Sequence, residues 1–147
     1  MSLQDHLPPD KAAELRKAAF KPFQVYRLPA KLKNRSHKYC ILICLSPTWF
    51  FFINSRIHEI SQFNHHLRSL QVFLPKDKHN FLSHDSYANC GVLVDDSMVV
   101  VETLFSGKVD YLGSIEDARI QQEIIDAVKA SRILTPIQKK DILAFLA

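Results

Sequence analysis

The sequence predicts an α+β protein, mostly β, in which short strands come first and helices come last. Two segments of the 147-residue chain carry the strand prediction, residues 39–45 (YCILICL) and 49–54 (WFFFIN). Short continuous runs of aromatic and β-branched residues are typical of strands that are buried on both faces. Residues 113–147 carry the helix prediction, because their apolar positions recur at helical spacing. Strands followed by helices indicate an α+β fold or a small barrel.

Shorter apolar segments next to turn-forming residues complete the predicted sheet: residues 23–28, 71–74, 92–94 and 98–103. The breaks at 46–48 and 95–97 each predict a hairpin, because they join two strand-like segments through very few residues. Residues 55–70 fit a helix or an irregular excursion equally well, and residues 76–80 predict a charged turn.

Three helices are predicted from their start signals. Asp10 can cap a short helix over residues 11–19. Ser114 and Asp117 have the spacing of a capping box before a helix of about four turns. Thr135, followed by Pro and then Gln at the third position, predicts a second C-terminal helix. One domain is therefore expected, with three parts: an N-terminal helical extension (1–21), a barrel (22–112) and C-terminal helices (113–147).

The charge balance favours polyanionic partners. The formal net charge is +4, and a basic run leads into the first long apolar strand: Lys31, Lys33, Arg35, His37 and Lys38. This run is either a phosphate-binding loop or a solvated turn, and both interpretations stay open. Only three Gly are present, which argues against a glycine-rich phosphate cradle.

The three cysteines predict buried thiols in a reducing, cytoplasmic protein. Their number is odd, and no CxxC pair supports a zinc site. Cys40 and Cys44 are four residues apart, which in a regular strand places them on one face. No metal site is expected from the histidines either, because no HExxH pattern is present. No apolar run is long enough to cross a bilayer.

Four segments, in order, resemble PemK/MazF-like ribonuclease toxins: residues 24–28 (QVYRL), 37–45 (HKYCILICL), 50–57 (FFFINSRI) and 81–90 (FLSHDSYANC). The resemblance covers roughly residues 23–134. It implies a compact SH3-like barrel with a C-terminal helix, a homodimer and a cognate antitoxin protein as partner. It also implies sequence-preferring cleavage of single-stranded RNA without a metal or other cofactor. His37 and Lys38 stand where the family usually has Arg-Pro, and its usual Thr falls nearest Asn54 or Ser55.

Cleavage of RNA requires a base for the 2′-hydroxyl, an acid for the leaving oxygen and positive charge near the phosphate. The resemblance implies four catalytic residues: His37, Asn54, Ser55 and His84. It implies a further set that contacts the substrate: Lys33, Arg35, Lys38, Arg56, Asp85 and Ser86. Each has a structural alternative, for example a turn in which His84 pairs with Asp85 and Ser86 acts as the cap. The alternative function is a non-catalytic barrel that binds RNA or a protein partner.

Overall fold

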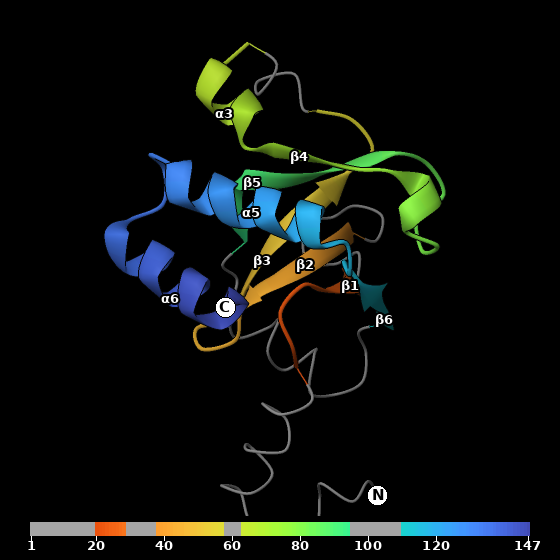
Figure 1. Ribbon diagram of the computed structural model, residues 1–147, viewed down its shortest axis with the longest axis horizontal. Helices are drawn as coiled ribbons and strands as arrows, with labels where there is room; N and C mark the ends of the chain where they lie inside the picture. The colour runs from red at the N-terminus through yellow and green to blue at the C-terminus, as the bar shows by residue number, and fades with distance from the viewer. Residues whose placement is uncertain (1–19, 29–37, 58–62, 95–109) are drawn as a thin grey trace, which may run out of the picture.

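A single antiparallel sheet of six strands forms the centre of the protein (Figure 1). The computed structural model describes residues 20–28, 38–57, 63–94 and 110–147. The strand order across the sheet is β4-β5-β3-β2-β1-β6. The strands are β1 (Gln24–Leu28), β2 (Lys38–Cys44), β3 (Trp49–Asn54), β4 (Gln71–Leu74), β5 (Ser86–Val94) and β6 (Asp110–Ser114). The helices are α3 (His65–Ser69), the 3-10 turn η3 (Lys76–Lys78), α5 (Ala118–Ala130) and α6 (Pro136–Leu146).

The α+β class is confirmed, and so are most of the predicted elements within the described residues. The two long apolar segments are strands β2 and β3, joined as an antiparallel hairpin across residues 46–48. The ambiguous segment 55–70 ends in the short helix α3, and the charged turn contains η3. The predicted helix over 11–19, the hairpin at 95–97 and the strand at 98–103 lie outside the described residues.

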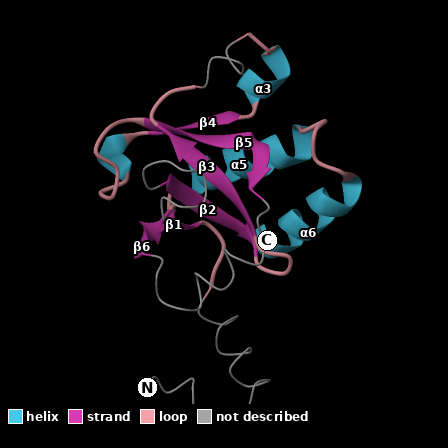
Figure 2. Cartoon of the chain, turned by 180° about the vertical axis from the view of Figure 1, so that it is seen from behind, coloured by secondary structure: helices cyan, strands magenta, loops and turns pink. Residues whose placement is uncertain are grey.

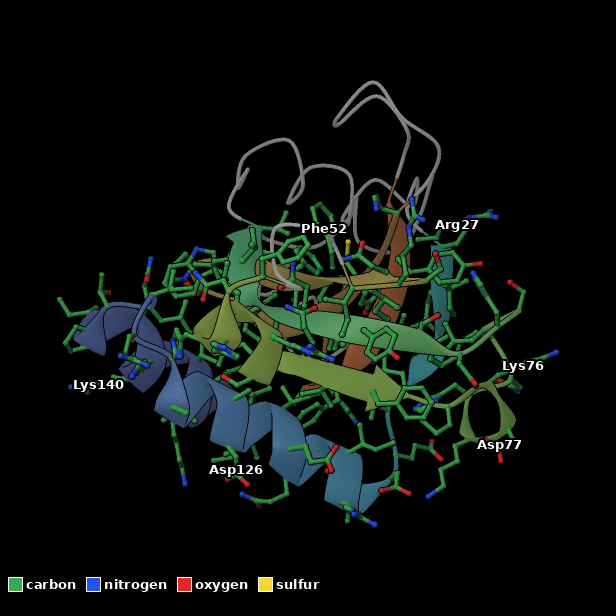
Figure 3. All side chains as sticks on the ribbon, turned by 90° about the horizontal axis from the view of Figure 1, so that it is seen from above. Arg27, Phe52, Lys76, Asp77, Asp126 and Lys140 are labelled. Carbon is green, nitrogen blue, oxygen red and sulfur yellow. The ribbon has the colours of Figure 1, made fainter. Side chains whose placement is uncertain are left out.

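The two faces of the sheet are buried in different ways. On one face, α5 and α6 pack against β2, β4 and β5, and their buried Ile124 and Ile142 join Ile41 and Phe51 in one apolar cluster (Figures 1 and 3). The opposite face carries a smaller buried cluster: Tyr26, Cys40, Leu42, Phe50 and Val94. Figure 2 shows this second face in front of the helices. Burial on both faces explains why β2 and β3 lack polar alternation.

The prediction that Cys40 and Cys44 share a face is wrong. The β2–β3 register shifts between Leu42 and Cys44, so the two-residue alternation is broken inside the strand. Cys40 therefore belongs to the smaller cluster, whereas Cys44 belongs to the helix-covered cluster and lies 3.9 Å from the carbonyl oxygen of Asp141. All three thiols are free and buried, as predicted.

The two C-terminal helices begin at side-chain caps. Asp117 itself is the N-cap of α5, and its carboxylate accepts hydrogen bonds from the Arg119 and Ile120 amides. The expected capping box starting at Ser114 is therefore wrong, because Ser114 still belongs to β6. The box at Thr135 is confirmed: its hydroxyl accepts from the Gln138 amide, and the Gln138 side chain accepts from the Thr135 amide.

Thr135→Ala is expected to lower the free energy of unfolding by about 1 kcal/mol, because it removes the side-chain cap of α6. Urea denaturation of both proteins measures this difference. Thr135→Ser, which keeps the hydroxyl, is the matched control and is expected to unfold close to the wild-type midpoint. An unchanged midpoint for the alanine variant would contradict a stabilising role for this cap.

The sheet is open within the residues that the structure describes. Strands β4 and β6 lie at its two edges, and each pairs with one neighbour only. In the same part of the chain, none of the helices combines the length and the apolar character that a membrane crossing requires.

Candidate nucleic-acid interface

One end of the sheet gathers most of the residues that the sequence singles out. Because neighbouring strands are antiparallel, β1, β3 and β4 end where β2, β5 and β6 begin. This end therefore carries Lys38 at the start of β2, Asn54 at the end of β3, and the turn that leads into Ser86. Segments far apart in the sequence meet here, and we call this the strand-end site.

Lys38 and Asn54 form the centre of the strand-end site. The Lys38 ammonium donates a hydrogen bond to the Asn54 side-chain oxygen over 3.1 Å. The same ammonium lies 5.6 Å from the centroid of the Phe52 ring, which is within reach of a cation–π interaction. These two contacts hold the Lys38 ammonium on the face of the sheet opposite α5 and α6, where Phe52 packs against the smaller cluster.

Two further aromatic residues, Tyr87 and Phe73, form a row with Lys38 and Asn54 across neighbouring strands of the sheet. The register places Asn54 opposite Tyr87 of β5, and Tyr87 opposite Phe73 of β4. Cross-strand partners project to the same face, and strands are about 4.8 Å apart, so the row from Lys38 to Phe73 spans ~14 Å. Phe73 is 45% exposed, and its ring centroid lies 5.5 Å from that of Tyr87. A basic group, an amide and two aromatic rings thus share one surface.

The segment before β5 is held in a tight turn. His84 is exposed, and its Nδ1 lies 3.1 Å from the Ser83 hydroxyl. The Asp85 carboxylate accepts the Lys76 amide at 2.9 Å. Ser86 is only 2% exposed, and its hydroxyl donates to the His84 carbonyl. Within this turn, Ser86 therefore stabilises the backbone, while the side chain of His84 faces solvent.

The other predicted site residues fall into two groups. Ser55 and Arg56 are exposed and directly follow Asn54, so they belong to the strand-end site by position. The remaining three lie outside the described residues: Lys33, Arg35 and His37. The structure thus joins Lys38 to Asn54 directly and brings the 84–86 turn to the same end of the sheet.

A neighbouring turn is anchored to helix α5. The Lys78 ammonium of η3 contacts the Asp117 carboxylate at 2.8 Å, which links this turn to the N-cap of the helix. His79 is 2% exposed, and its Nδ1 lies 2.8 Å from the Pro75 carbonyl oxygen. Both ends of the turn are therefore fixed before any ligand arrives.

The Lys78–Asp117 contact predicts a pH dependence of stability. The hydrogen bond from Lys78, together with the helix amides, lowers the pKa of Asp117 below its usual value. A carboxyl group whose folded pKa is depressed stabilises the protein above its unfolded pKa, near 4, and this contribution disappears as the pH falls further. Asp117→Asn retains a capping oxygen but loses the ion pair.

We therefore expect Asp117→Asn to lower the thermal midpoint at pH 7, with a difference from wild type that shrinks below about pH 4. Thermal unfolding between pH 7 and pH 3 measures this. Asp126→Asn, on the exposed side of α5 (Figure 3), is the matched control. A difference that stays constant over this pH range would show that the charge of Asp117 contributes nothing.

A shallow hollow lies at the corner of the strand-end site next to η3. It has a volume of about 530 Å³ and is lined by Phe73, Pro75, Lys76, Asp77 and Asp85. Residues two apart in an extended segment project to the same side, so the hollow continues the surface formed by Tyr87 and Phe73. Figure 3 shows Lys76 and Asp77 at this end of the sheet, with Lys140 at the opposite end of the molecule.

Several titratable groups have no place in an acid–base mechanism. Burial raises the pKa of the Cys40, Cys44 and Cys90 thiols, so they stay protonated at neutral pH and are poor nucleophiles. Burial, with a smaller effect of Tyr111, raises the pKa of Tyr26 to about 12. Throughout the described ranges, no three His, Cys, Asp or Glu side chains gather as a metal site would require.

The aromatic residues of the strand-end site were not among the residues predicted from the sequence. Phe52, Phe73 and Tyr87 read as ordinary strand residues, and only the cross-strand register reveals that the latter two align with Asn54. Their positions could have indicated the site, because each lies next to the last or first residue of a strand, beside a charged turn: Phe73 near the end of β4 and Tyr87 near the start of β5.

Comparison with known proteins does not extend these observations. No family model matches the chain, and no curated protein matches it closely enough to count as a relative.

Proposed function

We propose that the chain is a metal-independent endoribonuclease that binds and cleaves single-stranded RNA at the strand-end site. The observation that carries the proposal is the convergence of Lys38, Asn54 and the 84–86 turn at one end of the sheet. The fold brings these segments together although up to about thirty residues separate neighbouring members in the sequence. Basic and polar groups on an aromatic surface suit a single nucleic-acid strand.

In this proposal each group has a distinct task. Lys38 and Arg56 neutralise the phosphate, and the Asn54 amide together with the Ser55 hydroxyl orients its oxygens. His84 is exposed at the same end and serves as one acid–base group, because its imidazole nitrogens can both accept and donate a proton. His37, which directly precedes Lys38 in the sequence, is proposed as the second.

The architecture and partners of the proposal follow from the resemblance to PemK/MazF-like toxins. We propose that the six strands, which form an open sheet in the described residues, belong to an SH3-like barrel, and that the functional unit is a homodimer with the RNA in a shared groove. A cognate antitoxin protein covers the strand-end site and suppresses cleavage. The antiparallel sheet followed by two helices supports this architecture.

A non-catalytic RNA-binding protein is the second candidate, and one specific observation favours it. Asp85 and Ser86 are engaged within their own turn, through the Lys76 amide and the His84 carbonyl. A turn stabilised in this way presents a fixed surface even without a catalytic role. Such a protein binds RNA with the same salt dependence but leaves the chain intact.

Incubation with a long single-stranded RNA in EDTA, followed by mapping of the cut ends, distinguishes the two candidates. The proposal predicts cleavage that leaves 2′,3′-cyclic or 3′-phosphate ends, because the 2′-hydroxyl is the nucleophile. Cleavage is expected to fall strongly in His84→Ala and to vanish when the RNA is replaced by DNA of the same sequence. Binding without any cut product at stoichiometric enzyme would refute the enzyme and support the second candidate.

A further inference from the structure

The hollow beside η3 has the features of a pocket for one flat aromatic ligand. Its volume is about 530 Å³, but it is shallow and largely open to solvent, so it suits a group stacked on its wall rather than one enclosed in a cavity. Phe73 forms an exposed aromatic wall, supported by Tyr87 at a centroid distance of 5.5 Å. A planar ring can stack on Phe73 without displacing any buried side chain.

The rim of the hollow is fixed by four internal contacts. The Asp85 carboxylate accepts a hydrogen bond from the Lys76 amide, and the His79 ring contacts the Pro75 carbonyl oxygen. The Lys78 ammonium pairs with the Asp117 carboxylate, and the Ser86 hydroxyl donates to the His84 carbonyl. A rim fixed before binding loses little conformational freedom when a ligand enters, which favours affinity. None of these contacts uses the Phe73 side chain, which stays exposed.

The polar groups of the hollow select the kind of ring that it accepts. Asp77 and Asp85 carry carboxylates, which accept hydrogen bonds and donate none while ionised. Asp85 already accepts the Lys76 amide through one oxygen, so Asp77 is the more available carboxylate. A carboxylate pairs best with two adjacent N–H donors, which among the common bases only guanine presents, at N1 and N2.

We propose that this hollow binds a guanine base of single-stranded RNA, stacked on Phe73 and read by the carboxylate of Asp77. The inference rests on the proposed function, because it places the guanine further along the same RNA strand whose phosphate Lys38 holds. The row from Lys38 through Asn54 and Tyr87 to Phe73 lies on one face and spans ~14 Å. Lys76 at the rim offsets the repulsion between the two carboxylates and the adjacent phosphates.

The test uses fluorescently labelled 12-nucleotide RNAs with 2′-O-methyl groups, which block cleavage and leave binding to be measured by anisotropy. One RNA is all uracil, and the others carry a single guanine, adenine or cytosine. Wild type is expected to bind the guanine RNA roughly tenfold more tightly than the uracil RNA. Asp77→Asn is expected to abolish this preference while leaving affinity for the uracil RNA equal or higher.

The stacking contact is tested separately. Phe73→Leu keeps an apolar side chain beside Tyr87 but is expected to weaken guanine-RNA binding roughly tenfold, whereas Phe73→Trp is expected to restore it. The matched controls are Phe63→Leu, at an 82% exposed phenylalanine outside the hollow, and Asp126→Asn. Thermal midpoints of all variants verify that each protein is folded.

The possible outcomes separate this inference from the proposed function. If wild type cleaves RNA but Phe73→Leu and Asp77→Asn bind all four RNAs as wild type does, the guanine pocket is wrong and the endoribonuclease stands. If wild type never cleaves but shows the guanine preference and loses it in both variants, the pocket stands and the endoribonuclease is wrong. Binding of an arginine-rich peptide that depends on Phe73, with no binding of RNA, would overturn the pocket as a nucleobase site.

Discussion

Phe51→Ala is expected to lower the free energy of unfolding by about 3–5 kcal/mol, the largest effect on stability that we predict for a single substitution. Phe51 is fully buried in β3 and belongs to the apolar cluster that joins the sheet to Ile124 and Ile142 of the two helices. Removing its ring loses the transfer free energy of the aromatic group and leaves a cavity that close-packed neighbours cannot fill. A domain of this size has a total stability of about 5–15 kcal/mol, so much of it is lost.

Urea denaturation followed by tryptophan fluorescence measures this change, because Trp49 lies in the same strand and the same cluster. Phe63→Ala is the matched control, since Phe63 is 82% exposed and its loss is expected to change stability by less than about 0.5 kcal/mol. A loss below about 1 kcal/mol for Phe51→Ala would mean that the helices do not pack on this face of the sheet as described.

Lys38→Met is expected to have the largest effect on activity, a loss of cleavage rate on the order of 100-fold. Lys38 supplies the positive charge at the centre of the strand-end site, where its ammonium contacts the Asn54 oxygen and approaches Phe52. Methionine keeps the length and apolar stem of the side chain but removes the charge. The slope of log RNA affinity against log salt concentration is also expected to become shallower by about one, because one phosphate contact is lost.

Single-turnover cleavage and anisotropy at several salt concentrations measure the two effects. Lys140→Met removes an exposed lysine of α6 at the opposite end of the molecule (Figure 3), and it is expected to leave both quantities unchanged. Lys38→Arg keeps the charge and is expected to retain most of the affinity. If Lys38→Met cleaves at the wild-type rate with an unchanged salt slope, the phosphate does not bind at Lys38.

The sequence predicted the elements of the fold well where a single physical signal dominates. Continuous apolar runs identified β2 and β3, and the side-chain cap at Thr135 located the start of α6. The prediction failed where tertiary structure breaks a local rule. The bulge in β2 moves Cys44 to the face opposite Cys40, and the extension of β6 to Ser114 leaves Asp117 as the cap of α5. The local sequence does not indicate the bulge, because Cys44, the residue that changes face, is apolar like its neighbours.

The candidate site could be predicted from the sequence only in part, because some of its residues meet through strand pairing over long sequence distances. Lys38 and Asn54 stand at strand ends that are visible in the sequence, and the hairpin between them brings those ends together. Phe73 and Tyr87 join them only through the pairing of β5 with both β3 and β4. That pairing depends on contacts between segments distant in sequence, which periodicity within one segment does not encode.

A titration of the ¹⁵N-labelled protein with a 2′-O-methylated single-stranded RNA tests most directly whether the strand-end site binds RNA. The amide resonances of Lys38, Asn54 and Tyr87 are expected to shift in proportion to bound RNA, together with those of the 84–86 turn. Amides on the solvent-facing side of α5, such as that of Asp126, are expected to stay unchanged. Shifts confined to α5 and α6, or no shifts at an RNA concentration well above that of the protein, would contradict RNA binding at this end of the sheet.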